Sequence, residues 1–180
     1  MAGEISARPG MQEANRRWSA GVYLDTSVMV ALSDPEDEFH DGSVAFVRGL
    51  QARAISSSIG PPFTLEVAKA AEQRGTQAAL RLVSAVEGYG VELTRTLGDR
   101  LWSLSDEYAS RGVLREDRAL VDLLHYASAT PLGCIHLASW DKGHFNERVE
   151  RRVNATNASR GLTTLKVGSP ETIARHLGIA

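Results

Sequence analysis

Val22-Tyr23-Leu24-Asp25-Thr26-Ser27 is the stretch that decides the fold and directs the search for a functional site. Three apolar residues lead directly into a carboxylate and two hydroxyls, and a short apolar run with polar boundaries is typical of a buried strand. Val28-Met29-Val30-Ala31-Leu32 follows as an apolar helix. The pattern therefore places Asp25 at the carboxyl end of a strand, where open parallel α/β sheets bind their ligands. A second interpretation stays open, because Asp is a preferred N-cap residue and could simply begin the helix.

The composition narrows the class of protein. The chain has 180 residues, of which 43% are hydrophobic, and this is enough for one domain with a substantial core. The formal net charge of −2 gives no global attraction to nucleic acid, so a nucleic-acid site would have to be a local basic patch. Cys134 is the only cysteine, which excludes an internal disulfide and agrees with a reducing compartment.

The N-terminal segment differs from the rest of the chain. Residues 1–19 mix Gly, Pro, Arg, Glu and Gln without periodicity, which predicts a loose tail before a single domain over residues 20–180. Arg16, Arg17 and Trp18 have the chemistry to contact RNA or a partner, and a disordered extension is the alternative. The tail lacks the apolar core of a signal peptide, and no run is long enough to span a membrane. We therefore expect a cytoplasmic protein.

Strand and helix signals alternate along the chain after the first strand. Further strands are expected at residues 54–59, 91–93 and 134–138, with an edge strand at 163–167 and a loop at 153–157. Helices are expected at residues 39–50, 63–72, 76–86, 97–108 and 117–129, with a short last helix from Pro170. Such alternation is typical of the α/β class and predicts one three-layer α/β/α domain around a mainly parallel sheet.

Three further acids occupy positions comparable with that of Asp25. Glu66 lies in the first turns of a helix directly behind the second strand, and Asp141 follows a strand as Asp25 does. Asp122 stands inside a mostly apolar helix, where a carboxylate is costly unless it is paired or bound to a metal. Asp117, at the start of that helix, is expected to act only as an N-cap or first-turn acid. Since parallel strands place their carboxyl ends along one edge, the sequence predicts an acidic cluster there.

Clustered carboxylates repel one another, so such a group implies a hard cation. Oxygen ligands suit Mg²⁺ or Mn²⁺, and Mg²⁺ is often held by a few carboxylates together with substrate phosphate. The chemistry that uses such a site is displacement at phosphorus. Other reaction classes lack their motifs, because the chain has no Gly-rich phosphate loop, cysteine pair for zinc, metalloprotease histidine spacing or Gly-x-Ser-x-Gly elbow.

These residues resemble the motifs of the PIN-domain ribonuclease family, many of whose members are VapC-type toxins of type II toxin–antitoxin pairs. The matching segments run in the family's order over about residues 21–170 and are Tyr23-Leu24-Asp25-Thr26-Ser27, Thr64-Leu65-Glu66-Val67, Asp122-Leu123-Leu124-His125-Tyr126-Ala127 and Ser139-Trp140-Asp141. The resemblance implies an endoribonuclease that depends on Mg²⁺ or Mn²⁺, is often a homodimer and is silenced by a cognate antitoxin.

The resemblance also assigns roles to single residues. It implies that the metal is held by four acids, which are Asp25, Glu66, Asp122 and Asp141. One of these carboxylates would help to deprotonate the attacking water, and Thr26 or Ser27 would orient Asp25 or a bound water. Two departures weaken the match. Pro61-Pro62 directly before the Glu66 helix could displace it, and Asp141 corresponds to the most variable acid of the family.

Residues around the expected edge leave alternatives open. His125 has the chemistry to bind phosphate, but a hydrogen-bonded structural histidine is the alternative. Arg115, Arg118 and Lys142 border the edge and could contact an RNA backbone, although isolated surface cations are commonly only solvated. Two rival functions also remain at this point, namely a non-catalytic PIN-like module that binds RNA or protein and another Mg²⁺-dependent phosphohydrolase acting on small phosphate esters.

Overall fold

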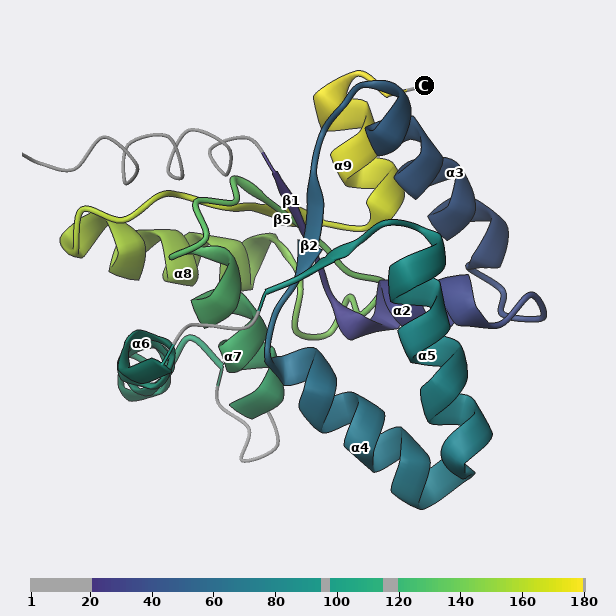
Figure 1. The fold of residues 1–180 in the computed structure, drawn as a ribbon. Coiled ribbons are helices and arrows are strands. Elements are labelled where there is room, and N and C mark those ends of the chain that lie inside the picture. The colour runs from purple at the N-terminus through teal and green to yellow at the C-terminus, as the bar shows by residue number, and fades with distance from the viewer. Residues whose placement is uncertain (1–20, 95–97, 115–119, 180) are drawn as a thin grey trace, which may run out of the picture.

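The computed structural model describes residues 21–94, 98–114 and 120–179, and its centre is a sheet of five strands that all run parallel. The order across the sheet is β3-β2-β1-β4-β5 (Figure 1). The strands are β1 (Val22–Leu24), β2 (Ser57–Ile59), β3 (Glu92–Leu93), β4 (His136–Ala138) and β5 (Lys166–Gly168). The expected α/β class and parallel sheet are therefore confirmed, although several strands are shorter than the sequence predicted.

The first strand divides the core into two halves. Val22 and Leu24 are fully buried in one apolar cluster, whereas Tyr23 between them is buried in the other. This alternation follows from the period of two along a strand, which sends successive side chains to opposite faces of the sheet. Because both faces need cover, β1 is apolar throughout and the sheet is the middle layer of three.

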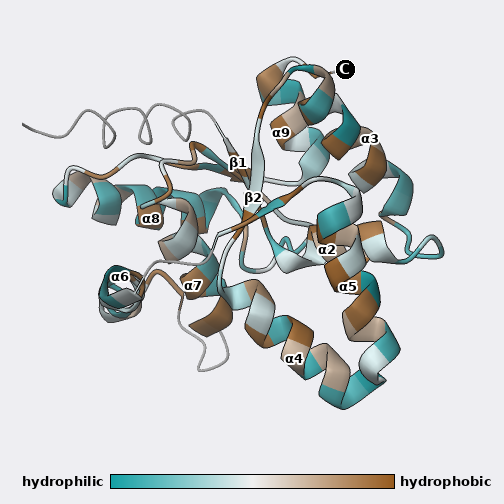
Figure 2. Ribbon diagram, viewed as in Figure 1, coloured by the Kyte–Doolittle hydropathy of each residue, from teal (hydrophilic) through white to brown (hydrophobic). Residues whose placement is uncertain are grey.

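Helices cover both faces of the sheet (Figure 1), and apolar and polar residues alternate along them (Figure 2). Their buried apolar residues pack with the strands in two clusters. One layer contains α2 (Thr26–Ser33), α3 (His40–Ala52), α4 (Pro62–Arg74), α5 (Thr76–Gly88) and α9 (Pro170–Leu177). The other contains α6 (Gly98–Ser110), α7 (Leu120–Ala129) and α8 (Glu147–Ser159). The predicted α/β/α sandwich is therefore what the described residues form. In this part of the chain no helix has both the length and the hydropathy to cross a bilayer.

The strand order places a crevice beside β1. The chain runs outward from β1 to β2 and β3, and then returns to the opposite side of β1 to form β4 and β5. When the chain leaves two neighbouring strands in opposite directions, a crevice forms between the carboxyl ends of these strands. Open α/β sheets bind their ligands in this crevice. In this chain the two neighbours are β1 and β4, which deliver Asp25 and Ser139 to that point.

The structure corrects one expected element. Residues 153–157 were predicted to be a loop, but they belong to α8, whose N-cap Asn146 accepts hydrogen bonds from the backbone of Arg148 and Val149. The helix is largely polar, and Val149 and Val153 are its buried apolar side chains, so the sequence offers few apolar residues from which to recognise it.

Two asparagines lower the intrinsic helix propensity of α8. Their side chains nevertheless stabilise the helix, because they bond to the segment that precedes β5. The side chain of Asn154 donates to the carbonyl of Leu165 at 2.8 Å and accepts from its amide at 2.7 Å. Asn157 is fully buried and donates to the carbonyl of Thr163 at 2.8 Å. These tertiary hydrogen bonds outweigh a propensity that ranks Asn among the poorer helix formers.

Some expectations fall on residues outside the described ranges. The proposed tail at residues 1–19, with Arg16, Arg17 and Trp18, is among them. So are Arg115, Asp117 and Arg118 near the predicted start of the helix that is observed from Leu120. The last helix begins at Pro170 as predicted, and β5 is the edge strand that was expected near its place.

Candidate functional site

Asp25 is fixed at the carboxyl end of β1 by donors from two neighbouring strand ends. Its Oδ2 accepts from the Ser27 hydroxyl at 2.6 Å, the Ser27 amide at 3.2 Å and the Ser139 hydroxyl at 2.8 Å. The carboxylate is 5% exposed and is also the N-cap of α2. The N-cap interpretation is therefore confirmed, and the cap leaves Oδ1 directed toward His125 at the strand end where a ligand site was predicted.

Ser27 and Ser139 form a small hydroxyl bridge beneath Asp25. Their oxygens lie 3.2 Å apart, and Ser27 Oγ accepts from the amide of Trp140 at 3.0 Å. Ser139 Oγ accepts from the amide of Asp141 at 3.0 Å. The bridge ties the loop after β1 to the loop after β4, so the positions of Asp25 and Asp141 are set by one network of hydrogen bonds.

His125 lies at the centre of the inner half of the site. Its Nε2 is 3.3 Å from Asp25 Oδ1, 3.1 Å from Glu66 Oε2 and 3.5 Å from Thr26 Oγ1. The ring is fully buried. Burial favours the neutral ring, but the Asp25 charge and the hydrogen bond with Glu66 outweigh burial and raise the pKa of His125. The structure therefore supports the structural interpretation of His125, which holds two of the predicted acids together.

The other ring nitrogen of His125 is fixed by Tyr23. The Tyr23 hydroxyl lies 3.0 Å from Nδ1 and accepts a hydrogen bond from the Gly60 amide at 3.0 Å. A Cβ on residue 60 would come within 2.7 Å of that hydroxyl and within 2.8 Å of Ser128 Oγ. Glycine is therefore required at residue 60 for this close approach to Tyr23. The hydrogen bond from Gly60 fixes the Tyr23 hydroxyl, which in turn contacts Nδ1 of the His125 ring.

Glu66 reaches the site from the second turn of α4. Pro61 is the N-cap of this helix and Pro62 is its first residue, a position where proline is favourable because its fixed φ suits the helix and no amide is lost. The Pro-Pro pair thus starts α4 and does not displace Glu66. Burial alone would raise the pKa of Glu66, but the hydrogen bond and charge of His125 outweigh it and hold the pKa below its usual value.

Asp122, Asp141 and His144 form the outer half of the site. His144 Nδ1 lies 2.7 Å from Asp122 Oδ2 and 3.5 Å from Asp141 Oδ2. Asp122 is in the first turn of α7, and Asp141 accepts from the Gly143 amide at 2.7 Å in the loop after β4. Burial, followed by the nearby Asp25 charge, raises the pKa of Asp122 to about 6. Asp25 and Asp122 are therefore close enough to repel each other although they belong to different halves.

The donor set fits a hard divalent cation. Two groups of three have ligand atoms within 4.8 Å of one another, one formed by Asp25, Glu66 and His125 and the other by Asp122, Asp141 and His144. Burial and the neighbouring charge of Asp25, which raise the pKa of Asp122, both disfavour its ionised form, and a bound cation would offset them. Carboxylate oxygens suit Mg²⁺ or Mn²⁺, and the histidines are placed to orient the acids.

Sequence reasoning missed His144 and the role of Ser139. His144 follows Asp141 by three residues in the same loop, and this spacing after a predicted strand is the signal that could have found it. Ser139 was part of a quoted motif, but its contact with Asp25 requires two strands to be neighbours. Lys142 is exposed beside the site, as expected for either of its two interpretations.

Comparisons with known proteins agree with the fold. No protein-family model matches the sequence, and no curated protein matches it. The solved structure of VapC20 from Mycobacterium tuberculosis, a sarcin–ricin loop cleaving toxin, is similar with a TM-score of 0.53 and 17% sequence identity. The similarity covers 69% of this chain and 92% of that one. At this identity it establishes a shared architecture, and the chain has the PIN-like three-layer fold that the sequence predicted.

Replacing Asp122 with Asn should stabilise the metal-free protein and remove its response to Mn²⁺. Asparagine keeps an acceptor for His144 but no longer repels Asp25, so we expect a gain of about 1 kcal/mol in unfolding free energy in EDTA. Added Mn²⁺ should stabilise the parent protein and leave the variant nearly unchanged. Urea denaturation with EDTA or with Mn²⁺ measures both effects.

Asp106→Asn is the matched control, because Asp106 is exposed on α6. It should change neither the stability in EDTA nor the shift caused by Mn²⁺. A full Mn²⁺ shift in Asp122→Asn would contradict a metal role for Asp122.

Proposed function

We propose that this chain is an endoribonuclease that hydrolyses RNA phosphodiester bonds with the help of Mg²⁺ or Mn²⁺. The observation that carries the proposal is that two acidic groups, Asp25 with Glu66 and Asp122 with Asp141, form at the carboxyl edge of a parallel sheet, where the charge of Asp25 acts on Asp122. The acids come from four different elements, so only the fold brings them together. VapC20, which has a similar architecture, cleaves the sarcin–ricin loop, and this supports RNA as the substrate.

The residues have distinct parts in this proposal. Asp25, Asp122 and Asp141 hold the cation, with Glu66 joined to them through His125. A divalent cation would supply Lewis-acid polarisation of the phosphoryl group and charge stabilisation of the leaving oxygen. One of the carboxylates accepts the proton of the attacking water, as a general base must.

Ser27 acts in the proposal by orienting Asp25, and Thr26 acts by contacting His125. The Ser27 hydroxyl and amide fix Asp25 Oδ2, so Oδ1 keeps a constant direction toward the interior. Thr26 Oγ1 lies instead 3.5 Å from His125 Nε2. Both hydroxyls therefore support the acids through preorganised hydrogen bonds, which reduce the reorganisation needed during the reaction.

Asp25→Asn should reduce metal-dependent RNA cleavage at least about a hundred-fold, because it removes a charged ligand that the fold holds in place. The measurement is cleavage of a structured RNA by the purified chain with Mn²⁺ and with EDTA. Asp106→Asn, which changes the same charge at an exposed position, should cleave as the parent protein does.

The same assay separates the rival functions. Equal cleavage by the parent chain and Asp25→Asn would show that the activity is not that of this site. RNA binding without cleavage would favour the non-catalytic module. Turnover of a chromogenic phosphomonoester without RNA cleavage would favour a phosphohydrolase of small esters.

His144→Ala should raise the Mn²⁺ concentration for half-maximal cleavage about tenfold while leaving the rate at saturating Mn²⁺ nearly unchanged. The reason is that His144 contacts Asp122 and Asp141, and residues that orient metal ligands commonly contribute ten- to a hundred-fold to metal affinity. His176→Ala, on the exposed surface of α9, is the control. An unchanged Mn²⁺ dependence would exclude this positioning role.

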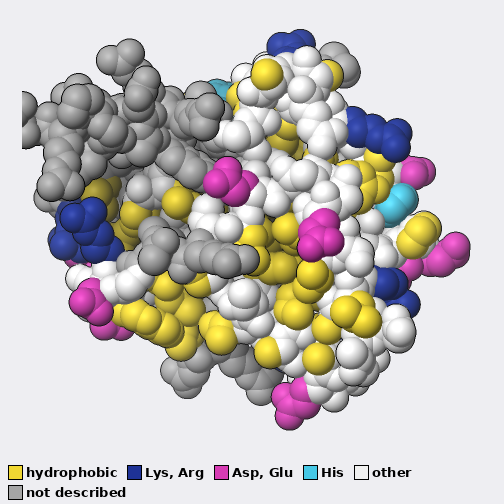
Figure 3. All heavy atoms as spheres, in the orientation of Figure 1, with side chains coloured by type: hydrophobic (Ala, Val, Ile, Leu, Met, Phe, Trp, Pro, Cys, Tyr) yellow, Lys and Arg dark blue, Asp and Glu magenta, His cyan; other side chains and the backbone are white. Residues whose placement is uncertain are grey.

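The proposed partners are a cognate antitoxin and a second copy of the chain. Large apolar side chains are exposed on α4 and α5, namely Leu65, Leu80 and Val83, and on α6 and α7, namely Trp102 and Leu120. In Figure 3, hydrophobic side chains gather on the lower half of the face that is drawn, where Figure 1 places α4, α5 and α7. Contiguous apolar surface of this kind commonly marks a protein–protein interface.

Sedimentation velocity should give twice the chain mass of 19.5 kDa for the free protein. Leu80→Ser with Val83→Ser should shift the protein toward the monomer, because burial of these side chains would drive association. Ile135→Ser is the control, because Ile135 is also exposed but lies directly before β4, outside α4 and α5. A monomeric parent protein would contradict the homodimer.

A further inference from the structure

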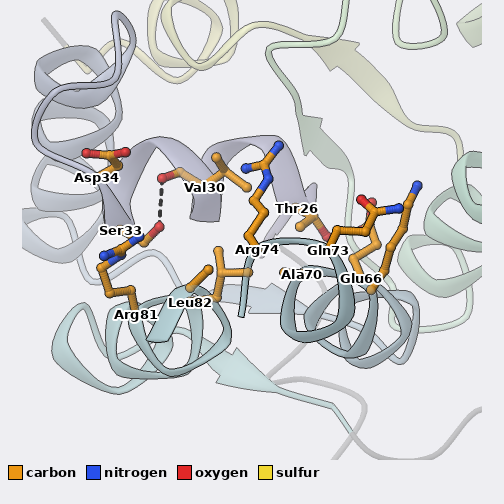
Figure 4. Close-up of a pocket in the computed structure, with 12 residues that line it drawn as sticks. Thr26, Val30, Ser33, Asp34, Glu66, Ala70, Gln73, Arg74, Arg81 and Leu82 are labelled. Carbon is orange, nitrogen blue, oxygen red and sulfur yellow. Dashed lines mark hydrogen bonds between the residues drawn. The ribbon is translucent and has the colours of Figure 1, made fainter. Parts of the chain in front are cut away.

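A groove leads away from the acidic cluster between α2 and the α4–α5 hairpin. It encloses a cavity of about 200 Å³. Thr26 and Glu66, which contact His125, line one end, and Ser33 and Asp34 line the other (Figure 4). The groove is therefore continuous with the site at which the proposed reaction takes place.

Three cations line the walls of this groove. Lys69 and Arg74 belong to α4 and Arg81 belongs to α5, and all three are exposed. Among the described residues, no carboxylate lies within the 4.0 Å of an ion pair from any of them. In Figure 4 the Arg74 side chain extends toward α2, and Arg81 lies near Ser33. Two carboxylates, Asp34 and Glu66, also line the groove, and the charge of Lys69 acts on Glu66. The three cations therefore outnumber the carboxylates of the lining and leave Arg74 and Arg81 without an ion pair among the described residues.

Neutral residues complete the lining in a way that suits a nucleotide chain. Val30, Ala70 and Leu82 provide apolar surface, and Gln73 provides an amide between Lys69 and Arg74 on α4. Phosphates pair with Lys and Arg, amides can bond to sugar or base, and apolar surface can contact sugars. The three cations of this lining distinguish it from the site at its end, where carboxylates and histidines come together.

We propose that the groove binds the phosphate backbone of a single-stranded RNA segment adjacent to the cleavage position, through Lys69, Arg74 and Arg81. The inference rests on the proposed ribonuclease function. It adds the path of the RNA strand beside the acids and the residues that bind this strand. The small groove between two helical walls accommodates one strand, whereas a duplex would meet only its rim. A strand that places one phosphate at the acids then places its neighbours at the cations.

The test compares two double variants with the same change of charge, each made on an Asp25→Asn background that prevents cleavage. Arg74→Gln with Arg81→Gln removes two groove cations. Arg48→Gln with Arg151→Gln removes two exposed cations of α3 and α8, outside the groove. Fluorescence anisotropy of a labelled single-stranded RNA is recorded over a series of KCl concentrations, and thermal melting checks that both variants are folded.

Removal of the groove cations should lower RNA affinity about tenfold at low salt and make the salt dependence shallower. Each lost phosphate contact on a single strand reduces the slope of log K against log salt by about 0.7, so two contacts predict about 1.4. The control pair should keep nearly the slope of its background. In the cleavage-competent protein, the groove pair should raise KM for RNA and leave kcat nearly unchanged.

The outcomes distinguish this proposal from the proposed function. If Asp25→Asn abolishes cleavage but the groove and control pairs bind RNA with equal slopes, the groove proposal is overturned and the ribonuclease remains. If the parent chain cleaves nothing but the groove pair alone loses affinity and slope, the groove is supported without the nuclease. Failure of the Asp25→Asn background to bind the RNA overturns the groove proposal, and a groove that serves an acidic peptide of a partner protein would give this result.

Discussion

The site depends on the hydrogen bonds that hold Asp25 Oδ2 between Ser27 and Ser139. These bonds join the ends of β1 and β4, the two neighbouring strands from which the chain leaves in opposite directions. Oδ2 of this carboxylate accepts hydrogen bonds from the Ser27 amide and from the two hydroxyls, whereas Oδ1 is directed toward His125. Without this carboxylate the N-terminus of α2 would lose its cap, and Ser139, which accepts from the Asp141 amide, would lose its contact with the end of β1.

The two halves of the acidic cluster are balanced in different ways. In the inner half, the buried His125 compensates Asp25 and Glu66, so the pKa of Glu66 is lowered and that of His125 is raised. In the outer half, Asp122 keeps a raised pKa despite its contact with His144, because burial and the charge of Asp25 act on it together. The protein thus stabilises the acids of one half with a buried histidine and leaves Asp122 in the other half with its ionised form disfavoured, as the proposed binding of a cation there would require.

Much of this arrangement could be predicted from local sequence. The apolar run of β1 followed by Asp25 gave the strand, the helix cap and the first acid, because burial and capping are local signals. Asp122 and Asp141 were found for the same reason, since each acid interrupts or ends an apolar segment. What could not be predicted depends on tertiary contacts. Helix α8 is stabilised by asparagine side chains that bond to a segment outside the helix. His144 is recognisable as part of the site only through its contact with Asp122, which lies on another element.

Helix α2 links chemistry and substrate binding in the proposals made above. Its N-terminus is capped by Asp25, and its side chains Thr26, Val30 and Ser33 form one wall of the groove. Ser33 follows Thr26 by seven positions on the helix, so this wall extends for about 10 Å from the acids. A chain with a net charge of −2 can bind RNA only if its charges are separated locally. Here the acids converge at the strand ends, while cations that form no ion pair within the described part of the chain line the groove beside them. Helix α2 fixes the distance between the two.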